Sequence, residues 1–373
     1  MLRIDRRLLS NMDWLMAGTV VLLSAAGITT IFSATRPLFG GSQPDYYVKQ
    51  IYWLLIGLGA LTVIVSINYT WFHRVAYHLY GGGLAILCIV LIMGRVGGGA
   101  QRWLSLGPFN VQPSEFFKIA YLMALARFLS ADTEVLDGRR LAQGFGLLVL
   151  PPLLLVLVQP DLGTSMVLLL LFVGLVLAKG VQKRLAIILT LILLVSVPFL
   201  GTIAWDNLKD YQKDRIISFV RPGADARGLG YHVEQSKVAV GSGGLYGKGY
   251  LKGTQGPFRF LPEKHTDFVF AVFAEERGFF GSMILLSLYL TLLMRGLGAA
   301  RLAKDDFARY LCLGIVYLFA IHLFVNMGMT MGLAPVVGLP LPFMSYGGSA
   351  LLTNSMAVGV LMGIRARRFE LFF

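Results

Sequence analysis

Charged residues and cysteines are scarce in this chain of 373 residues. Asp, Glu, Lys and Arg make up only 14% of it, whereas soluble globular domains average about 25%. The chain as a whole is therefore not a soluble domain. Its two cysteines, Cys88 and Cys312, both fall inside apolar runs, so we expect inert packing and no structural disulfide.

Several motifs that carry chemistry in other proteins are also missing. The five histidines are dispersed, and neither HExxH nor CxxC spacing occurs. A zinc site made by protein ligands alone is therefore not expected. The phosphate-binding motif GxxxxGK[ST] does not occur either, so no nucleotide cofactor is implied.

Apolar residues dominate the rest of the sequence, with 56% hydrophobic residues and a mean hydropathy of +0.69. Continuous apolar windows are long enough to cross about 30 Å of hydrocarbon as helices, and they lack the alternation of a β-barrel. We predict an all-α polytopic membrane protein, one domain over residues 1–373 with a long outer loop at about 205–266. The ten predicted helices cover residues 13–34, 48–67, 75–94, 115–130, 142–159, 161–178, 184–204, 267–294, 308–331 and 346–364.

The distribution of Lys and Arg predicts how these helices are oriented. With a cytoplasmic N-terminus, the inner connections hold most of the basic residues. The short outer connections then hold only Arg36, Lys49, Arg95, Arg102 and Lys118. We therefore expect both termini in the cytoplasm and the long loop outside. The net charge of +13 follows mostly from this asymmetry, and nothing in the chain resembles a nucleic-acid-binding module.

Carboxylates gather in the outer half of the predicted bundle. Asp267 opens the eighth predicted helix, Asp161 lies in a connection too short to leave the interface, and Glu115 shares a helix face with Lys118. A charge inside a bilayer costs a few kcal/mol, so each of these groups should face protein, water or a partner. Structural ion pairs are the alternative for Glu115 with Lys118, and inter-helical contacts are the expected role of Glu275 and Glu276.

The outer loop contains a glycine-rich segment, QSKVAVGSGGLYGKGYLKGTQ (235–255), with Lys237, Lys248 and Lys252. Glycine lets backbone N–H groups converge on an anion, and lysine adds charge, so this segment could bind phosphate or pyrophosphate. An ordinary turn is the alternative interpretation.

A second irregular stretch lies near the C-terminus, GLPLPFMSYGGSA (338–350), which includes Ser345 and Ser349. Its prolines prevent a continuous helix. Irregular backbone at membrane depth is tolerated where it lines a cavity, so we expect a site there.

Six motifs occur in a fixed order along almost the whole chain. They are GAQRWLSLG (99–107), QPSEFFKIA (112–120), QPDLGTS (159–165), GYHVEQSKVAVGSGGLYGKG (230–249), FLPEKHTDFVFAVFAEERG (260–278) and LPFMSYGGSALL (341–352). Together they resemble the signature of the SEDS family (shape, elongation, division and sporulation). The sequence GTQ followed by FLPE resembles the elongation branch of the family more than its division branch.

This resemblance implies a peptidoglycan glycosyltransferase that polymerises lipid II on the outer face of the bacterial cytoplasmic membrane. Asp267 matches the family's essential catalytic aspartate in its HTDF motif. The family's polar cavity residues match Arg102, Glu115, Lys118 and Asp161. The resemblance also implies a class B penicillin-binding protein as partner, a transpeptidase that cross-links the new strand, besides contact with membrane lipid.

The chemistry of such a polymerase suggests roles for these groups. Asp267 would accept the proton of the acceptor sugar's 4-hydroxyl while that oxygen attacks the anomeric carbon of the donor, with inversion. Glu263 and His265 would orient it, and Thr266 would bind substrate or support the site. The leaving undecaprenyl pyrophosphate of the donor strand needs neutralisation by Lys or Arg, by backbone N–H groups, or by a divalent cation such as Mg²⁺ or Mn²⁺.

Two other functions remain as alternatives. A flippase that moves lipid II would also need a polar cavity open to lipid, but its polar groups should run through the full membrane thickness. A scaffold that only positions the transpeptidase would need no catalytic carboxylate.

Overall fold

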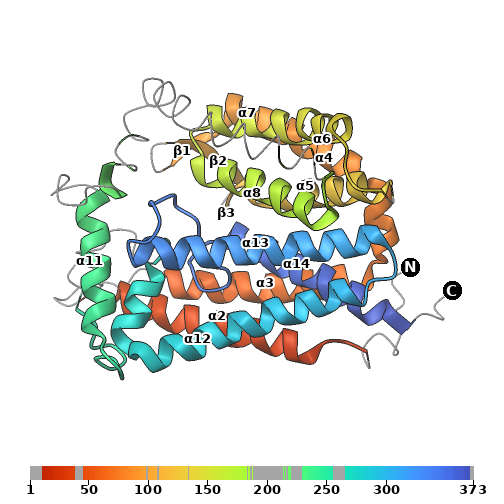
Figure 1. Ribbon diagram of the computed structural model, residues 1–373. Coiled ribbons are helices and arrows are strands. Elements are labelled where there is room, and N and C mark those ends of the chain that lie inside the picture. Colours follow the sequence, from red (N-terminus) through yellow and green to blue (C-terminus); the bar gives the residue numbers. More distant parts are fainter. Residues whose placement is uncertain are drawn as a thin grey trace.

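The computed structural model describes residues 11–37, 45–97, 100–106, 109–132, 134–182, 229–254 and 265–369, together with isolated positions between 184 and 219. Its long helices run side by side in one bundle, and α11 (Leu229–Ser242) lies across one end of it (Figure 1). We call this the α11 end. The chain enters its first long helix and leaves its last one at the opposite end (Figure 1).

Among the described residues, eight helical segments are long and apolar enough to cross a membrane, which confirms the predicted all-α membrane fold. They are α2 (Trp14–Thr35), α3 (Tyr46–Ser66), α4 (Tyr69–Met93), the composite segment Gly138–Val158, α8 (Leu162–Lys179), α12 (Val269–Arg301), α13 (Asp306–Thr330) and α14 (Gly348–Ala366).

Two of the ten predicted spans are not among these eight. Residues 115–130 do form a helix, α5 (Pro113–Ser130), but it carries three charged side chains, Glu115, Lys118 and Arg127. Most of its residues are nevertheless buried, because α5 packs against α4 and α13 inside the bundle. The predicted span 184–204 lies largely outside the described residues.

A buried carboxylate ties three helices together at the end opposite α11. Asp13 caps α2 by accepting a hydrogen bond from the N–H of Met16 at 3.2 Å, as short polar side chains do at helix N-termini. Its other oxygen accepts from Arg295 of α12 at 2.8 Å and pairs with Arg365 of α14 at 3.1 Å. The basic residues predicted for the inner face therefore include two that hold the bundle together.

The segment Gly138–Val158 is helical throughout but irregular, in the order α6 (Gly138–Gly144), a π-helical turn (Phe145–Val149) and α7 (Leu150–Val158). Two consecutive prolines follow Leu150. Proline has no N–H to donate to the carbonyl four residues earlier, so the carbonyls of Leu147 and Leu148 need other donors. The hydroxyl of Tyr80 on α4 lies 3.0 Å from each of them.

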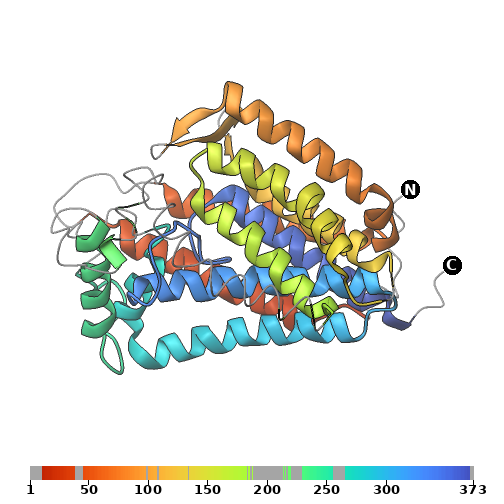
Figure 2. The ribbon, with the colours of Figure 1, turned by 45° about the horizontal axis from the view of Figure 1, so that its top comes forward.

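A small antiparallel sheet connects α4 to α5 at the α11 end (Figures 1 and 2). It contains β1 (Arg95–Gly97), β2 (Ala100–Leu106) and β3 (Phe109–Val111) in that order. These strands were not predicted, because the segment looks only like a short connection in the sequence. Strand β2 carries Arg102, one of the predicted site residues.

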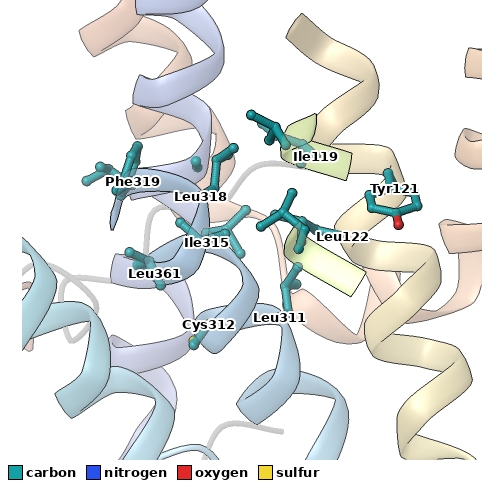
Figure 3. Packing of buried hydrophobic residues seen from close by; sticks show 14 of the residues in the cluster. Ile119, Tyr121, Leu122, Leu311, Cys312, Ile315, Leu318, Phe319 and Leu361 are labelled. Atoms are coloured by element: carbon teal, nitrogen blue, oxygen red, sulfur yellow. The ribbon is translucent and has the colours of Figure 1, made fainter. Parts of the chain in front are cut away.

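The apolar core lies where α5, α13 and α14 meet. Figure 3 shows Leu122 of α5 facing Leu311 and Ile315 of α13, with Leu361 of α14 nearby. Cys312 is fully buried in this core as a free thiol. In Figure 2, α4 and α12 lie at opposite edges of the bundle with α13 and α14 between them.

Candidate functional site

Asp267 lies in the turn that precedes α12, at the α11 end, and it is only partly buried. Its backbone carbonyl accepts a hydrogen bond at 3.0 Å from the side-chain amide of Asn326 on α13. Its carboxylate faces Gly338, because a Cβ built on that glycine would lie 3.5 Å from Asp267 Oδ2. The predicted catalytic carboxylate is therefore within reach of solvent, while its backbone is fixed by the bundle.

The loop 331–347 forms one wall of the site. The hydroxyl of Ser345 donates to the carbonyl of Thr266 at 2.7 Å and accepts from the N–H of Leu341 at 2.8 Å. The N–H of Tyr346 donates to the carbonyl of His265 at 2.8 Å. These contacts join the residues just before α12 to the loop. Residues 338–347 are irregular as expected, whereas 348–350 form the first turn of α14 (Gly348–Ala366).

Gln50 of α3 also forms hydrogen bonds with this loop. Its side-chain amide donates to the carbonyl of Ser345 at 3.1 Å, and its amide oxygen accepts from the N–H of Gly347 at 3.3 Å. Both contacts satisfy backbone groups that the irregular loop leaves without partners in regular structure. The loop is thus held by side chains from α3 and α13 and by the turn before α12.

An aromatic cluster forms around His265, which lies in the same turn as Asp267. The ring of Tyr46 stacks on His265 with centroids 4.6 Å apart, and both rings contact Tyr346. Burial raises the pKa of the Tyr346 phenol, and the neighbouring Tyr46 raises it further. The Tyr346 hydroxyl therefore stays protonated at neutral pH and can donate a hydrogen bond. Flat, partly polar faces of this kind suit the rings of a carbohydrate.

Glu115 and Lys118 form a buried ion pair at 2.8 Å on α5. Lys118 Nζ also lies 3.3 Å from Nε2 of His322 on α13, whose Nδ1 lies 3.0 Å from the carbonyl of Pro340. This chain of contacts reaches the same loop that faces Asp267. The sequence spacing predicted the ion pair, and the structure shows that it supports the loop wall.

Arg102 and Asp161 make a second pair at the α11 end, with Nη1 and Oδ1 3.6 Å apart. Asp161 also caps α8 by accepting from the N–H of Thr164 at 3.1 Å. Arg102 donates to the carbonyls of Gln159 and Pro160. These hydrogen bonds connect β2 to the turn before α8. The side chain of Arg102 remains 24% exposed, which leaves part of the cation available to a ligand.

Ser349 lies at the start of α14, where its hydroxyl accepts from the N–H of Gln112 at 3.0 Å. This bond joins the loop after the sheet to the start of α14. Ser349 is buried, so in this conformation it serves the packing of the site and does not face solvent.

The glycine-rich segment is not an open anion cradle over its described part. Residues 235–242 belong to α11, and 243–254 form turns that pack on a break in α12 at Gly278 (φ 66°, ψ −163°). At the break, backbone N–H and carbonyl groups of α12 lose their hydrogen-bond partners within the helix, and backbone groups of the turns take their place. The backbone N–H groups of Lys248 and Gly249 donate to the carbonyls of Glu275 and Glu276 at 3.0 and 3.1 Å. In the other direction, the N–H groups of Phe279 and Phe280 donate to the carbonyls of Gly244 and Leu245 at 2.9 and 3.1 Å.

Two of the three lysines in this segment, Lys237 and Lys248, pair with glutamates. Lys248 Nζ lies 2.6 Å from Oε1 of the fully buried Glu275, which also accepts from the N–H and hydroxyl of Thr254. Lys237 pairs with Glu234 at 2.8 Å on the exposed face of α11. The alternative of ordinary turns therefore holds for residues 243–254, whereas 235–242 are helical. Glu275 makes a structural contact with these turns, and Glu276 makes the expected inter-helical contact by accepting from the hydroxyl of Ser33 on α2.

The structure brings some predicted residues together and separates others. His265, Thr266, Asp267 and Ser345 meet at one loop, and Glu115 with Lys118 supports that loop through His322. Glu263 lies outside the described residues. The residues that the sequence analysis missed are Gln50, His322 and Asn326. Each is a polar side chain inside a long apolar helix, and this is the signal that could have identified them.

In the part of the chain that the structure describes, no three His, Cys, Asp or Glu side chains converge on one point. Mg²⁺ commonly needs only one or two protein carboxylates when substrate phosphates supply further ligands, so the expectation of a divalent cation stays a prediction.

Comparison with known proteins gives consistent matches over nearly the full length. The model of the family described as "Cell cycle protein", which groups FtsW, RodA and SpoVE, matches residues 10–369. The peptidoglycan glycosyltransferase MrdB of Escherichia coli (strain K12) is 42% identical over 86% of this chain and 85% of its own. The probable peptidoglycan glycosyltransferase FtsW of Trichlorobacter lovleyi is 39% identical over 96% of this chain and 94% of its own.

Solved structures show the same fold. A chain from a peptidoglycan synthase complex, studied for the coordination of polymerization and crosslinking, superposes with a TM-score of 0.79 at 32% identity, covering 96% of this chain and 99% of that one. The rod shape determining protein RodA of Thermus thermophilus gives a TM-score of 0.70 at 29% identity, covering 96% and 98%.

Proposed function

Since this chain belongs to the SEDS family of peptidoglycan glycosyltransferases, which includes FtsW, RodA and SpoVE, we propose that it polymerises lipid II during cell elongation with Asp267 as general base. The structural similarity to the rod shape determining protein RodA of Thermus thermophilus supports the elongation role. The single observation that carries the catalytic assignment is the placement of Asp267, which is partly exposed beside a loop that three elements hold in place.

In the proposed reaction, the acceptor's 4-hydroxyl loses its proton to the Asp267 carboxylate while its oxygen forms a bond to the donor's anomeric carbon. The bond from that carbon to the pyrophosphate oxygen breaks, and its electron pair leaves with undecaprenyl pyrophosphate. Inversion follows from a single displacement. Pyrophosphate is already a good leaving group, so the mechanism needs no second carboxylic acid.

The residues around Asp267 take positioning roles in this proposal. The rings of Tyr46, His265 and Tyr346 contact one another beside the turn that carries Asp267 and would contact the sugar. The hydrogen bond from the hydroxyl of Ser345 to the carbonyl of Thr266 keeps the loop close to the turn that carries Asp267. Lys118 is buried and paired, so it would act through the loop, whereas the exposed part of Arg102 could contact the pyrophosphate. The described residues contain no group of three potential metal ligands, and no step here depends on a protein-held cation.

We further propose a class B penicillin-binding protein as partner and a bacterial inner-membrane location with both termini cytoplasmic. The similarity to a chain from a peptidoglycan synthase complex supports the partner. The orientation is supported by Arg295 and Arg365, which pair with Asp13 at the end where the chain enters α2 and leaves α14. Arginines are enriched on the cytoplasmic side of a membrane protein.

Purified protein with its partner, lipid II and Mg²⁺ or Mn²⁺ tests the proposal. We expect glycan polymer on gels from the native chain and none from Asp267→Asn, which keeps the side-chain shape but removes the base. Asp306→Asn is the matched control, because Asp306 is a carboxylate at the start of α13, at the other end of the bundle. Undiminished polymer from a folded, partner-bound Asp267→Asn protein would contradict the mechanism. Movement of labelled lipid II across liposomes without polymer would favour the flippase alternative.

A further inference from the structure

An apolar groove of about 300 Å³ runs between α2 and α12. Its volume is at the lower end of the range for ligand pockets, about 300 to 1,000 Å³. Ala25 and Thr29 line it from α2, and Phe273, Ile284 and Leu288 line it from α12. Ala25, Thr29 and Ile284 are exposed. Both helices are candidate membrane spans, so at this depth the groove would open to lipid rather than to water.

One cation, Arg277, lines the groove together with these apolar residues. Its side chain is exposed, and its guanidinium lies over the ring of Tyr250, 5.4 Å from the centroid. The neighbouring carboxylate of Glu276 turns inward, where it accepts from the hydroxyl of Ser33. Gly281 leaves room for the stem of Arg277, because a Cβ there would overlap it.

The position of Ser33 shows how deep Arg277 lies in the membrane. Ser33 is in the last turn of α2, which ends at Thr35, and its bond to Glu276 places Arg277 level with that end. Beyond the break at Gly278, α12 rises about 15 Å along the groove to Leu288, at about 1.5 Å per residue. Half of the hydrocarbon thickness is about 15 Å, so the groove is one leaflet deep.

Exposed aromatic side chains surround the break in α12 at the same level. Tyr246, Phe279 and Phe280 are 80%, 54% and 49% exposed, and Tyr246 contacts Phe280 with ring centroids 5.2 Å apart. Aromatic residues gather where the bilayer meets water. They therefore place Arg277 at the height of the lipid headgroups.

We propose that this groove is a binding site for a phospholipid with an anionic headgroup. The headgroup phosphate pairs with the guanidinium of Arg277, and one acyl chain lies against Ala25, Ile284 and Leu288. The cation matches the negative charge of the headgroup, and the apolar groove, one leaflet long, matches the acyl chain. This site is separate from the loop that faces Asp267, and it does not depend on the proposed polymerase activity.

Native mass spectrometry of the purified chain, titrated with phosphatidylglycerol or phosphatidylcholine, tests the proposal. We expect the native chain to retain phosphatidylglycerol preferentially. Arg277→Gln should weaken that binding about fivefold, the effect of one surface cation on an anionic lipid, while Arg277→Lys should largely keep it. Arg301→Gln is the matched control, since Arg301 is an exposed arginine at the opposite end of α12.

A second variant tests the groove itself. Ala25→Phe fills it from an exposed position on α2 and should weaken binding of phosphatidylglycerol while leaving thermal stability unchanged. Equal loss in Arg277→Gln and Arg301→Gln would overturn the proposal, as would full lipid retention in Ala25→Phe. Loss of a single-span partner from Ala25→Phe, with lipid retention unchanged, would instead identify the groove as a docking site for a transmembrane helix and also overturn it.

Discussion

The side chain of Asn326 connects Asp267 to the loop that faces it. Its amide nitrogen donates to the backbone carbonyl of Asp267 at 3.0 Å and to that of Leu339 at 2.8 Å. Asn326 is fully buried on α13. One side chain therefore sets the position of the proposed base relative to Gly338, and the activity should depend on it although it does not face the carbohydrate.

Asn326→Ala should lower polymerisation on the order of 10²-fold, the cost of about 1 Å of displacement at a reacting group. It should also destabilise the fold by about 1 to 3 kcal/mol for each carbonyl left without a donor. Ser355→Ala is the control, since it removes a buried hydroxyl that bonds only within α14, to the carbonyl of Leu351. Rates per folded molecule, measured with lipid II, separate the two effects. Equal rates for both variants would contradict a positioning role.

Gly338→Ala should reduce activity more than its cost in stability explains. Gly338 has φ +73°, so any side chain there costs roughly 1 to 2 kcal/mol of strain, and the new methyl group would also contact Asp267 Oδ2. Gly332→Ala has a matched backbone (φ +72°) but meets the flexible end of Lys237 instead. We expect similar shifts in thermal unfolding from both variants and loss of polymer only from Gly338→Ala. Retained activity in both would show that the carboxylate does not work in this orientation.

The Glu115–Lys118 pair should behave as a buried ion pair in stability measurements. Removal of one partner leaves an uncompensated buried charge and costs about 3 to 5 kcal/mol, so Glu115→Gln and Lys118→Met should each lower the unfolding temperature in detergent. The double variant should recover more than half of that loss, because no charge remains. Simple addition of the two single effects would contradict direct coupling between these side chains.

Glu275 should hold the turns 243–254 onto α12. Glu275→Gln removes the charge that Lys248 and Thr254 contact, so trypsin should cleave after Lys248 or Lys252 faster than in the native chain. Glu234→Gln makes the same change in the exposed pair with Lys237. Exposed pairs contribute only about 0 to 1 kcal/mol, and we expect no change from this control. Matching cleavage rates in the two variants would exclude this role for Glu275.

The class of the protein, and most of its helices in their order along the chain, followed from the sequence alone. Long apolar runs with few charges require helices in a membrane, since lipid offers no partner to an unpaired backbone group. The spacing of Glu115 and Lys118 was enough to predict their pair, because residues three apart are neighbours on any helix. The motif resemblance selected Asp267.

Contacts between distant segments were decided only by the tertiary structure. Asn326, His322 and Gln50 are far along the chain from Asp267, and only the packing of α3, α5 and α13 brings their amide and imidazole groups to one loop. Lys248 appeared available to phosphate in the sequence, yet Glu275 lies beside it because α12 breaks at Gly278. Local periodicity reports which face of a helix is apolar, but it carries no information on which neighbour that face meets.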